Sequence, residues 1–406
     1  MKVGFYIESS SEGGPDISLI NLIRAWPNKN DTFIIFCNRT HPGLPRIKKD
    51  LNGLVIFVDL AFLIYIDLYL AIEKKELPLY LEKAVKTFLY LIRFPLLFYQ
   101  HLLLKKIFCK FNLDLLLINN GGYPGAESCC AASVAASAVR IKTIMVVRGE
   151  PRKLRSWVEK LFEKLFDMIV DKNVNAFVAV SQAVKKAMIE NRFLSGEKIN
   201  VIYNGIAVPQ NIKPQVFNKD TFNIGIVSNF RSNKGHLILF KAVEQLINKR
   251  IPVALYVIGS GTPREEFKLK NWVREKKIGH TILFLGFINN VYDYIAGLDL
   301  IVIPTIKYEA CPVTSIEAMA MNVPVIASNV GGLSEIIQHG KNGLLFSSEK
   351  VKELSNLIEM LFKDDNFRSS LIKNGRNIYM TTFIADKMAE QYYKLIKKIV
   401  NLYAIP

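Results

Sequence analysis

The sequence predicts an α/β protein built of two doubly wound domains, and three observations support this prediction. The chain has 406 residues, more than one ordinary hydrophobic core accommodates, and 50% of them are apolar. Short apolar runs alternate with longer stretches of helical periodicity, as in parallel sheets covered by helices. The alternation restarts after a proline-containing segment. We therefore expect a first domain at 1–208, a linker at 209–220, a second domain at 221–385 and a terminal helix at 386–406.

The N-terminal half begins with a buried type of strand at 3–7, followed by the pair Gly13-Gly14 and a helical pattern at 17–26. Glycines at such a turn let the backbone approach a phosphate or a sugar closely, although a simple tight turn explains them too. Ser181 is a suitable N-cap for a helix at 182–191. The other strands of this half are expected at 33–37, 55–58, 113–119, 143–147 and 177–180.

The C-terminal half repeats the pattern. Its strands are expected at 222–227, 253–258, 282–285, 301–304 and 323–327. Its helices are expected at 236–246, 313–321, 333–339, 351–361, 367–375 and 386–403. Pro312 suits the first position of the second of these helices, because a missing N–H costs nothing there. Loops that follow parallel strands meet at one edge of the sheet, where open α/β sheets bind their ligands.

Two carboxylates, Glu309 and Glu317, mark the loop and the helix that follow the strand at 301–304. A helix start offers unpaired N–H groups and a positive dipole end, which suit an anion. A carboxylate accepts hydrogen bonds from hydroxyl groups. A ligand with both phosphate and sugar hydroxyls, such as a nucleotide sugar, would satisfy both features. The alternative is that Glu317 only favours the helix N-terminus and Glu309 is a solvated loop residue.

The stretch from Glu309 onward resembles the C-terminal signature of the family-4 retaining glycosyltransferases, also described as glycosyl transferases group 1, which have the GT-B fold. The resemblance rests on Glu309, Glu317-Ala-Met-Ala, Pro324-Val-Ile-Ala, Gly331-Gly332, Glu335-Ile-Ile and Gly340-Lys-Asn-Gly-Leu-Leu. It implies two Rossmann-like domains facing a cleft, with a C-terminal helix that crosses back to the N-terminal domain. It also implies an enzyme that moves a sugar from a nucleotide-diphosphate donor with retention of configuration.

The resemblance assigns roles to residues of the second domain. Glu309 would hold hydroxyls of the donor sugar, and Glu317 would hold the ribose hydroxyls. The N–H groups of Val313 and Thr314 would take the diphosphate. The chain has Cys311-Pro312 where many members have Phe-Gly, and this change removes one possible N–H donor.

A basic pair ahead of the helix at 236–246 completes the expected donor site. Lys234 matches the Lys-Gly of the family, and Arg231 is the candidate replacement for an Arg whose usual position holds Asn229. Two cations at this point would neutralise the charge that develops on the leaving nucleotide. By the same resemblance, Phe287 lies in the segment near the nucleobase. The catalytic residues are therefore expected to be Glu309, Lys234 and Arg231.

The match is weaker in the N-terminal half. Gly13 and Gly14 correspond to the glycine loop that faces the diphosphate of the donor. Arg148 stands where many members have a His, and Glu150 lies two residues further on. Arg148 is expected either to contact an anionic acceptor or the donor sugar, or to form a structural pair with Glu150.

Composition and motifs limit the classes of partner and cofactor that we expect. The formal net charge of +17 favours an anionic partner, but the sequence has no zinc-finger spacing, ribonucleoprotein motif or basic heptads, so we expect no nucleic acid. The segment Gly259-Ser-Gly261-Thr-Pro-Arg264 lacks the third glycine of the dinucleotide fingerprint, which disfavours NAD. Asp-x-Asp is also missing, so we expect no metal and no cofactor apart from the nucleotide sugar, which is a co-substrate. The odd number of cysteines and the strand at the very start predict a cytosolic protein without a signal peptide.

The segment 60–111 mixes apolar and aromatic runs with cations that include Lys74, Lys75, Lys105 and Lys106. Charges interrupt it too often for a membrane span. Apolar faces with basic flanks are typical of interfacial helices, and the segment 153–166 has the same character. Core-facing helices of the first domain are an equally good interpretation of 60–111. We expect peripheral attachment to an anionic membrane, on the cytoplasmic face.

The sequence therefore predicts transfer from a UDP- or GDP-linked sugar to a glycan or lipid-linked acceptor in cell-surface polysaccharide or lipopolysaccharide synthesis. Two alternatives remain open. One is a nucleotide-sugar epimerase or hydrolase with the same fold, although the five histidines do not cluster in the motifs. The other is a catalytically silent membrane-binding scaffold.

Overall fold

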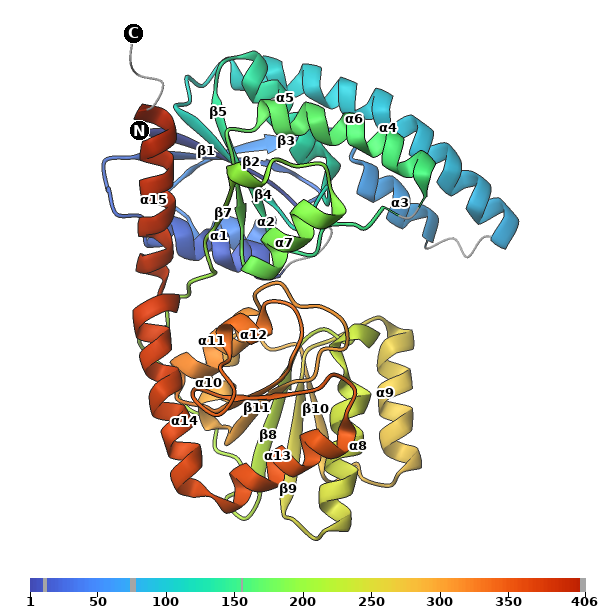
Figure 1. The fold of residues 1–406 in the computed structure, drawn as a ribbon, viewed down its shortest axis with the longest axis vertical. Helices are drawn as coiled ribbons and strands as arrows, with labels where there is room; N and C mark the ends of the chain where they lie inside the picture. Colours follow the sequence, from blue (N-terminus) through green and yellow to red (C-terminus); the bar gives the residue numbers. More distant parts are fainter. Residues whose placement is uncertain (10–12, 74–77, 155, 402–406) are drawn as a thin grey trace. The chain divides into compact units, whose positions relative to one another are not determined.

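The computed structural model describes residues 1–9, 13–73, 78–154 and 156–401. The chain forms two compact units, each built around its own parallel sheet (Figure 1). The first unit comprises residues 1–204 together with 388–406, and the second comprises residues 205–387. Both sheets have the doubly wound architecture that the sequence predicts.

The first unit contains a seven-stranded sheet in the order β3-β2-β1-β4-β5-β6-β7. All its strands are parallel, and the central ones are completely buried, as expected for a sheet with helices on both faces. The strand order reverses between β1 and β4, which is the position where such sheets bind ligands. The strands are β1 Lys2–Glu8, β2 Thr32–Asn38, β3 Ile56–Leu60, β4 Leu115–Asn120, β5 Lys142–Val147, β6 Ala176–Ala179 and β7 Ile199–Val201.

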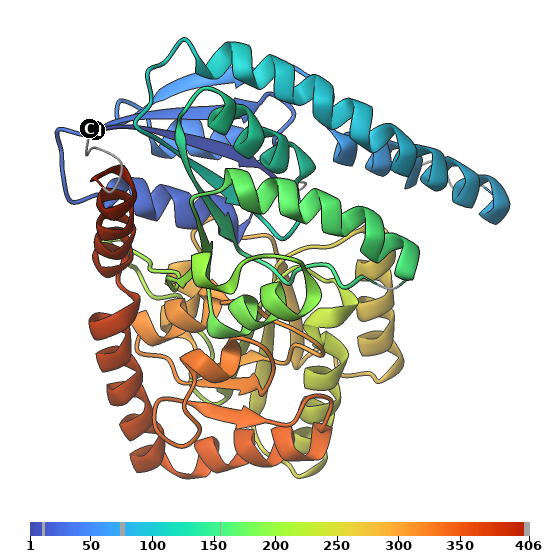
Figure 2. The same ribbon diagram turned by 45° about the horizontal axis from the view of Figure 1, so that its top comes forward.

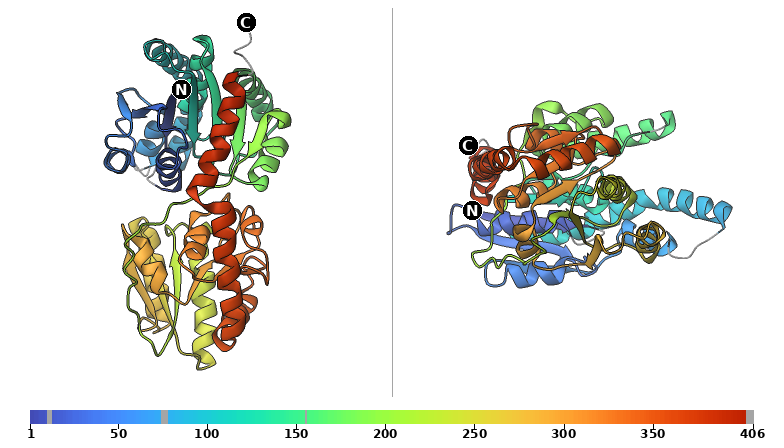
Figure 3. Two further views of the ribbon diagram at one scale, coloured as in Figure 1. Left: turned by 90° about the vertical axis from the view of Figure 1, so that its left-hand side faces the viewer. Right: turned by 90° about the horizontal axis from the view of Figure 1, so that it is seen from below.

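The helices of this unit include the last long helix of the chain, α15. As predicted, α15 lies along the N-terminal unit (Figure 3), where the ring of Tyr393 meets the edge of Trp26 with 5.8 Å between centroids. Tyr392 and Ile396 of α15 are also buried. The helices are α1 Gly14–Arg24, α2 Leu44–Asp50, α3 Tyr65–Glu73, α4 Leu79–Phe108, α5 Glu127–Ala138, α6 Trp157–Asn173, α7 Gln182–Asn191 and α15 Ala385–Asn401.

The second unit contains a six-stranded parallel sheet in the order β10-β9-β8-β11-β12-β13, and its order reverses between β8 and β11. The strands are β8 Phe222–Val227, β9 Val253–Ile258, β10 Ile282–Gly286, β11 Leu300–Ile303, β12 Val325–Ser328 and β13 Leu344–Phe346. The helices are α8 His236–Asn248, α9 Pro263–Glu275, α10 Val291–Gly297, α11 Val313–Ala320, α12 Leu333–Ile336, α13 Val351–Lys363 and α14 Asp365–Ile378.

One predicted helix is much shorter in the structure. The helix expected at 333–339 is only the four-residue α12, because Ile337 has extended backbone angles and His339 pairs with Gly343 as an isolated bridge. The segment 60–111 forms α3 and the 30-residue α4, which contains Pro95. The first turns of α4 project beyond the sheet together with α3 (Figure 2). Lys74 and Lys75 lie outside the described residues.

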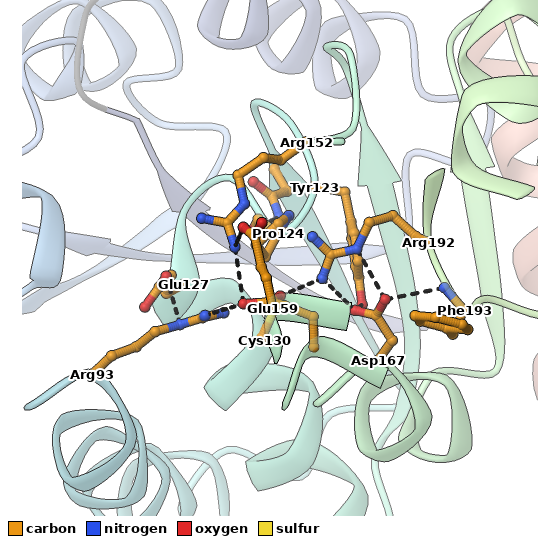
Figure 4. A network of polar contacts seen from close by, with 12 residues as sticks. Arg93, Tyr123, Pro124, Glu127, Cys130, Arg152, Glu159, Asp167, Arg192 and Phe193 are labelled. Carbon is orange, nitrogen blue, oxygen red and sulfur yellow. Dashed lines mark hydrogen bonds and ion pairs between the residues drawn. The ribbon is translucent and has the colours of Figure 1, made fainter. Parts of the chain in front are cut away.

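A buried network of charges joins α4, α5, α6 and the residues after α7 (Figure 4). Glu163 of α6 is its centre: it binds Arg93 of α4, Arg152 at 2.9 Å and Arg192 at 2.5 Å. Arg192 also binds Asp167, at 2.6 Å. Although burial acts to raise it, the hydrogen bond from Arg93 and the charges of the three arginines hold the pKa of Glu163 below its usual range.

Removing Glu163 should therefore destabilise the first unit. Glu163→Ala removes an acceptor from the buried Arg93 and Arg192, and we expect a loss of about 3–5 kcal/mol of unfolding free energy. Glu190→Ala is the control, since Glu190 forms only an exposed pair with Lys186 and should cost about 0.5 kcal/mol or less. Urea unfolding monitored by circular dichroism measures both values. Equal midpoints would show that the network does not stabilise the unit.

Candidate functional site at the carboxyl edge of the second sheet

The loops after β8 and β11 meet where the order of the second sheet reverses. Lys234, in the short 3-10 turn Ser232–Lys234 after β8, forms an ion pair with Glu309, in the loop after β11. Thr305 donates its hydroxyl to the same carboxylate oxygen at 3.1 Å. The side chains of Lys234 and Glu309 are 23% and 13% exposed, so the pair lies at the surface of the unit but is partly shielded. Two residues that the sequence placed in one site are thus in direct contact.

Glycines bring these loops together. Gly235 has φ +73°, and a Cβ atom there would lie 1.8 Å from the carbonyl oxygen of Pro304. Gly331 has φ +53°, and its Cβ atom would lie 2.2 Å from the carbonyl oxygen of Glu309. The next residue, Gly332, donates its N–H to that carbonyl at 2.7 Å. The backbone beside Lys234 and that of Glu309 are therefore fixed by contacts that only glycine permits.

Helix α11 starts beside this pair. Pro312 is its N-cap, one position earlier than predicted, and Val313 is its first residue. The hydroxyl of Thr314 donates to the carbonyl of Val227 at the end of β8, at 3.4 Å. The first N–H groups of a helix have no acceptor within it, so they are the natural ligands for an anion at this edge.

The remaining predicted residues of this unit lie around the same edge with different exposures. Glu317 of α11 is buried, with 6% of its surface exposed, and Cys311 before the helix is buried to the same degree. Arg231 precedes the turn that carries Lys234, and its side chain is exposed. Phe287 follows β10 and is 63% exposed. The structure therefore brings Lys234 and Glu309 into direct contact and places the others around the same edge, while their roles stay predictions.

His236 is a residue of this site that the sequence reasoning passed over. It is the first residue of α8, directly after Lys234-Gly235, and is buried with its Nε2 atom 3.3 Å from the hydroxyl of Ser228. Its ring packs edge-on against Phe230, with 5.2 Å between centroids. Burial, aided by the charge of Lys234, lowers the pKa of His236 to about 4. Its place after the Lys-Gly pair was the signal that could have identified it.

The predicted residues of the first unit have structural partners. Gly13 precedes α1 and donates its N–H to Asp16 at 3.1 Å, and Gly14 begins the helix. Arg148, at the end of β5, is buried and donates to Asn119 at 2.5 Å.

Arg148 also donates to Ser18 and to Asn204, both at 2.7 Å. A pair of Arg148 with Glu150, which the sequence offered as one alternative, stays a prediction. The guanidinium ties α1 to the segment after β7 through neutral side chains. A role of Arg148 or Glu150 toward the acceptor stays a prediction.

Glu8 is a second residue that the sequence reasoning did not single out. It ends β1 at the carboxyl edge of the first sheet and is buried, with 4% of its surface exposed. Burial, together with the charges of Asp67 and Glu127, raises the pKa of Glu8 to about 8. At neutral pH this residue is therefore mainly a protonated acid, able to donate a hydrogen bond from the edge where the strand order reverses.

Family comparisons match both halves of the chain. Residues 12–208 match the family described as Glycosyltransferase Family 4, and residues 208–378 match Glycosyl transferases group 1. The chain belongs to the GT-B glycosyltransferases. This agrees with the resemblance found in the sequence, and the two matches meet at residue 208.

Individual relatives of this GT-B chain are distant. The capsular polysaccharide biosynthesis glycosyltransferase CapM of Staphylococcus aureus is 25% identical over 73% of this chain and 81% of its own length. The UDP-Gal:alpha-D-GlcNAc-diphosphoundecaprenol alpha-1,3-galactosyltransferase of Escherichia coli is 24% identical over 54% of this chain and 57% of its own length. The chain spans only a little over half the length of several other relatives that it matches.

Solved structures confirm the fold of this GT-B chain. The crystal structure of Anabaena HepE in complex with UDP superimposes with a TM-score of 0.74 and 19% sequence identity, covering 98% of this chain and 100% of HepE. At this identity the likeness establishes the architecture alone.

The close approach at Gly235 gives a test of how the site is held. Gly235→Ala should cost roughly 3 kcal/mol or more of unfolding free energy, because the methyl group meets the Pro304 carbonyl and the left-handed backbone is strained as well. Gly340→Ala is the matched control, with φ +75° but nothing within 4 Å of the added carbon, and should cost about 1 kcal/mol. Thermal and urea unfolding compare the two variants. A Gly235→Ala protein as stable as Gly340→Ala would contradict the assigned contact.

The buried His236 predicts a loss of stability in acid. Its pKa of about 4 in the folded protein is lower than the value near 6.5 in the unfolded chain, so the unfolded state binds more protons between these values. The stabilisation is complete above pH 6.5, and up to about 3 kcal/mol is lost as the pH falls toward 4. His236→Phe should remove this part of the pH dependence in urea unfolding measured from pH 4 to 7. Parallel stability curves for both proteins would exclude the assignment.

Proposed function

We propose that the protein transfers a sugar from a nucleotide-diphosphate donor to a hydroxyl group of a glycan or lipid-linked acceptor, with retention of configuration. The observation that carries this proposal is the contact of Lys234 with Glu309 at the edge where the second sheet reverses its strand order. A cation that neutralises phosphate and an anion that accepts sugar hydroxyls are held side by side there.

The expected chemistry follows from the charges. The bond from the sugar to the diphosphate breaks, and negative charge grows on the leaving phosphate oxygens. Lys234, the exposed Arg231 and the N-terminus of α11 at Val313 and Thr314 would stabilise that charge. Because these groups supply positive charge themselves, we expect transfer to proceed without a metal.

The two carboxylates would orient the donor. Glu309 exchanges its ion pair for hydroxyl groups of the sugar when Lys234 turns to the phosphate, and Glu317 takes the ribose hydroxyls. The exposed Phe287 would lie near the nucleobase, and Gly13-Gly14 would approach the diphosphate from the N-terminal domain. A UDP- or GDP-linked sugar fits these roles, and the UDP complex of HepE supports the first.

The names of two relatives support the acceptor class. CapM is named for capsular polysaccharide biosynthesis, and the Escherichia coli enzyme is named for a diphosphoundecaprenol-linked acceptor. No helix in the described parts of this chain has the length and apolar character that crossing a membrane needs. We propose that the protein works peripherally at the cytoplasmic face of a membrane, where a lipid-linked acceptor is presented.

Nucleotide sugars and two variants test this function. A panel of UDP- and GDP-linked sugars should raise the melting temperature of the wild-type protein when the correct donor is bound. Lys234→Ala and Glu309→Gln should each lower kcat at least about 100-fold, because each removes a group that acts on the reacting part of the donor. Turnover is measured by release of the nucleoside diphosphate.

A matched control tests whether activity falls merely because a surface charge is removed. Lys249→Ala removes a lysine that pairs with Glu359 on the surface of the same unit, and its activity should be unchanged. Near-normal turnover by Lys234→Ala and Glu309→Gln would remove these residues from the site. Failure of every nucleotide sugar to stabilise the wild-type protein would contradict the proposed donor class.

A further inference from the structure

Helix α6 has acidic side chains on its inward side and apolar side chains on its outward side, the reverse of an ordinary surface helix. Its inward side carries Glu163 and Asp167, whose side chains are at most 1% exposed. Its outward side carries large apolar residues instead of polar ones. These residues, which we call the α6 face, are Trp157 (77% exposed), Leu161 (56%), Phe162 (48%), Leu165 (60%), Met168 (52%) and Ile169 (53%). A contiguous exposed apolar stripe of this kind marks an interaction surface.

Each acidic side chain of α6 forms an ion pair with a basic residue of the same unit. Glu163 and Asp167 are held in the buried network of Figure 4. Glu159 pairs with Arg152 at 3.1 Å, and Asp171 pairs with Lys198 at 3.4 Å. The charges that α6 leaves exposed are therefore cations.

Three lysines of α6, Lys160, Lys164 and Lys172, are exposed. By helical spacing they lie beside the apolar stripe, since Lys160 is three residues from Trp157, Lys164 is three residues from Leu161 and Lys172 is three residues from Ile169. The α6 face is thus apolar in the middle, basic at its margin and free of exposed acids. This arrangement suits a surface that offers acyl chains and negatively charged headgroups together.

Helix α4 carries a second stripe of the same character. Phe94, Phe98 and Leu102 recur every four residues and are 38%, 64% and 43% exposed. They are followed by the exposed Lys105 and Lys106. Arg93 links α4 to α6 through Glu163, and its guanidinium lies 4.6 Å from the centre of the Phe166 ring of α6. The buried network therefore joins α4 to α6 within one unit, with Glu163 and Asp167 of α6 turned inward.

We infer that the α6 face is a docking surface for an anionic lipid bilayer, into whose headgroup region Trp157, Leu161, Phe162 and Leu165 insert while Lys160 and Lys164 contact lipid phosphates. The inference deepens the proposed function and rests on it for its purpose, because a lipid-linked acceptor is presented at a membrane. It assigns the membrane contact to a defined helix surface. A bilayer fits better than a second protein because the cations flank the apolar stripe, while the acids of α6 are already paired within this unit.

Vesicle sedimentation with the full chain tests the apolar part. Phe162→Ser/Leu165→Ser should weaken binding to phosphatidylcholine vesicles that contain phosphatidylglycerol by at least about 100-fold, since each side chain contributes about ten-fold or more when it leaves water. The control Val216→Ser/Phe267→Ser removes two apolar residues that are 77% and 67% exposed in the second unit, and should bind like the wild type.

Charge variants test the basic margin. Lys160→Gln/Lys164→Gln should weaken binding about 25-fold, because each lysine near an anionic surface contributes about five-fold. Lys268→Gln/Lys277→Gln lowers the net charge equally, using exposed lysines of the second unit, and should leave binding within about two-fold of the wild type. Binding should also fall in high salt and on vesicles of phosphatidylcholine alone.

The results separate this inference from the proposed function. Equal binding by the α6 variants and their controls, or equal binding to neutral and anionic vesicles, would overturn the docking surface. So would a wild-type protein that ignores vesicles but forms a dimer that Phe162→Ser/Leu165→Ser dissociates. Stabilisation by nucleotide sugars, measured on the same proteins, reports the donor site independently. If nucleotide sugars fail to stabilise a protein that still binds vesicles, the result would contradict the proposed function and leave the docking surface unaffected.

Discussion

The second unit depends on the contact between the loops after β8 and β11. Parallel strands send all these loops to one edge, but they meet closely only because Gly235 and Gly331 allow the backbone to pass within van der Waals contact of Pro304 and Glu309. Lys234 and Glu309 neutralise each other at that junction. A neutralised pair keeps the edge stable without ligand, and either partner can exchange its contact for a charged or hydroxylated group.

In the first unit, by contrast, the paired charges are buried between helices and do not lie at the edge of the sheet. Glu163 and Asp167 are buried among arginines from α4 and the segment after α7, a position where an unpaired charge would be prohibitive. Pairing them inside leaves the outer surface of α6 to apolar residues and lysines. One unit thus presents polar groups at the edge of its sheet, while the other presents an apolar and basic helix.

The sequence and the structure agree best where periodicity decides the element. The strands and helices that were predicted with bounds mostly follow those ranges within a few residues, because each has a face that must be buried. The sequence and the structure differ at helix ends, which depend on the backbone angles of single residues. Helix α12 ends after four residues because Ile337 is extended, and Pro312 is the N-cap of α11 and not its first residue. Periodicity carries no information about such single-residue angles.

By itself, the sequence determined the doubly wound fold, the family and the placement of a lysine and a glutamate in one site, because glycines and charges at loop positions are local signals. Only the tertiary structure decided that His236 is buried beside Lys234 and that Arg148 binds the neutral side chains of Asn119, Ser18 and Asn204. It also decided that the acids of α6 face inward. The direction in which an amphipathic helix turns its charged side depends on which partners the rest of the chain brings to it, and Arg93 and Arg192 come from distant parts of the sequence.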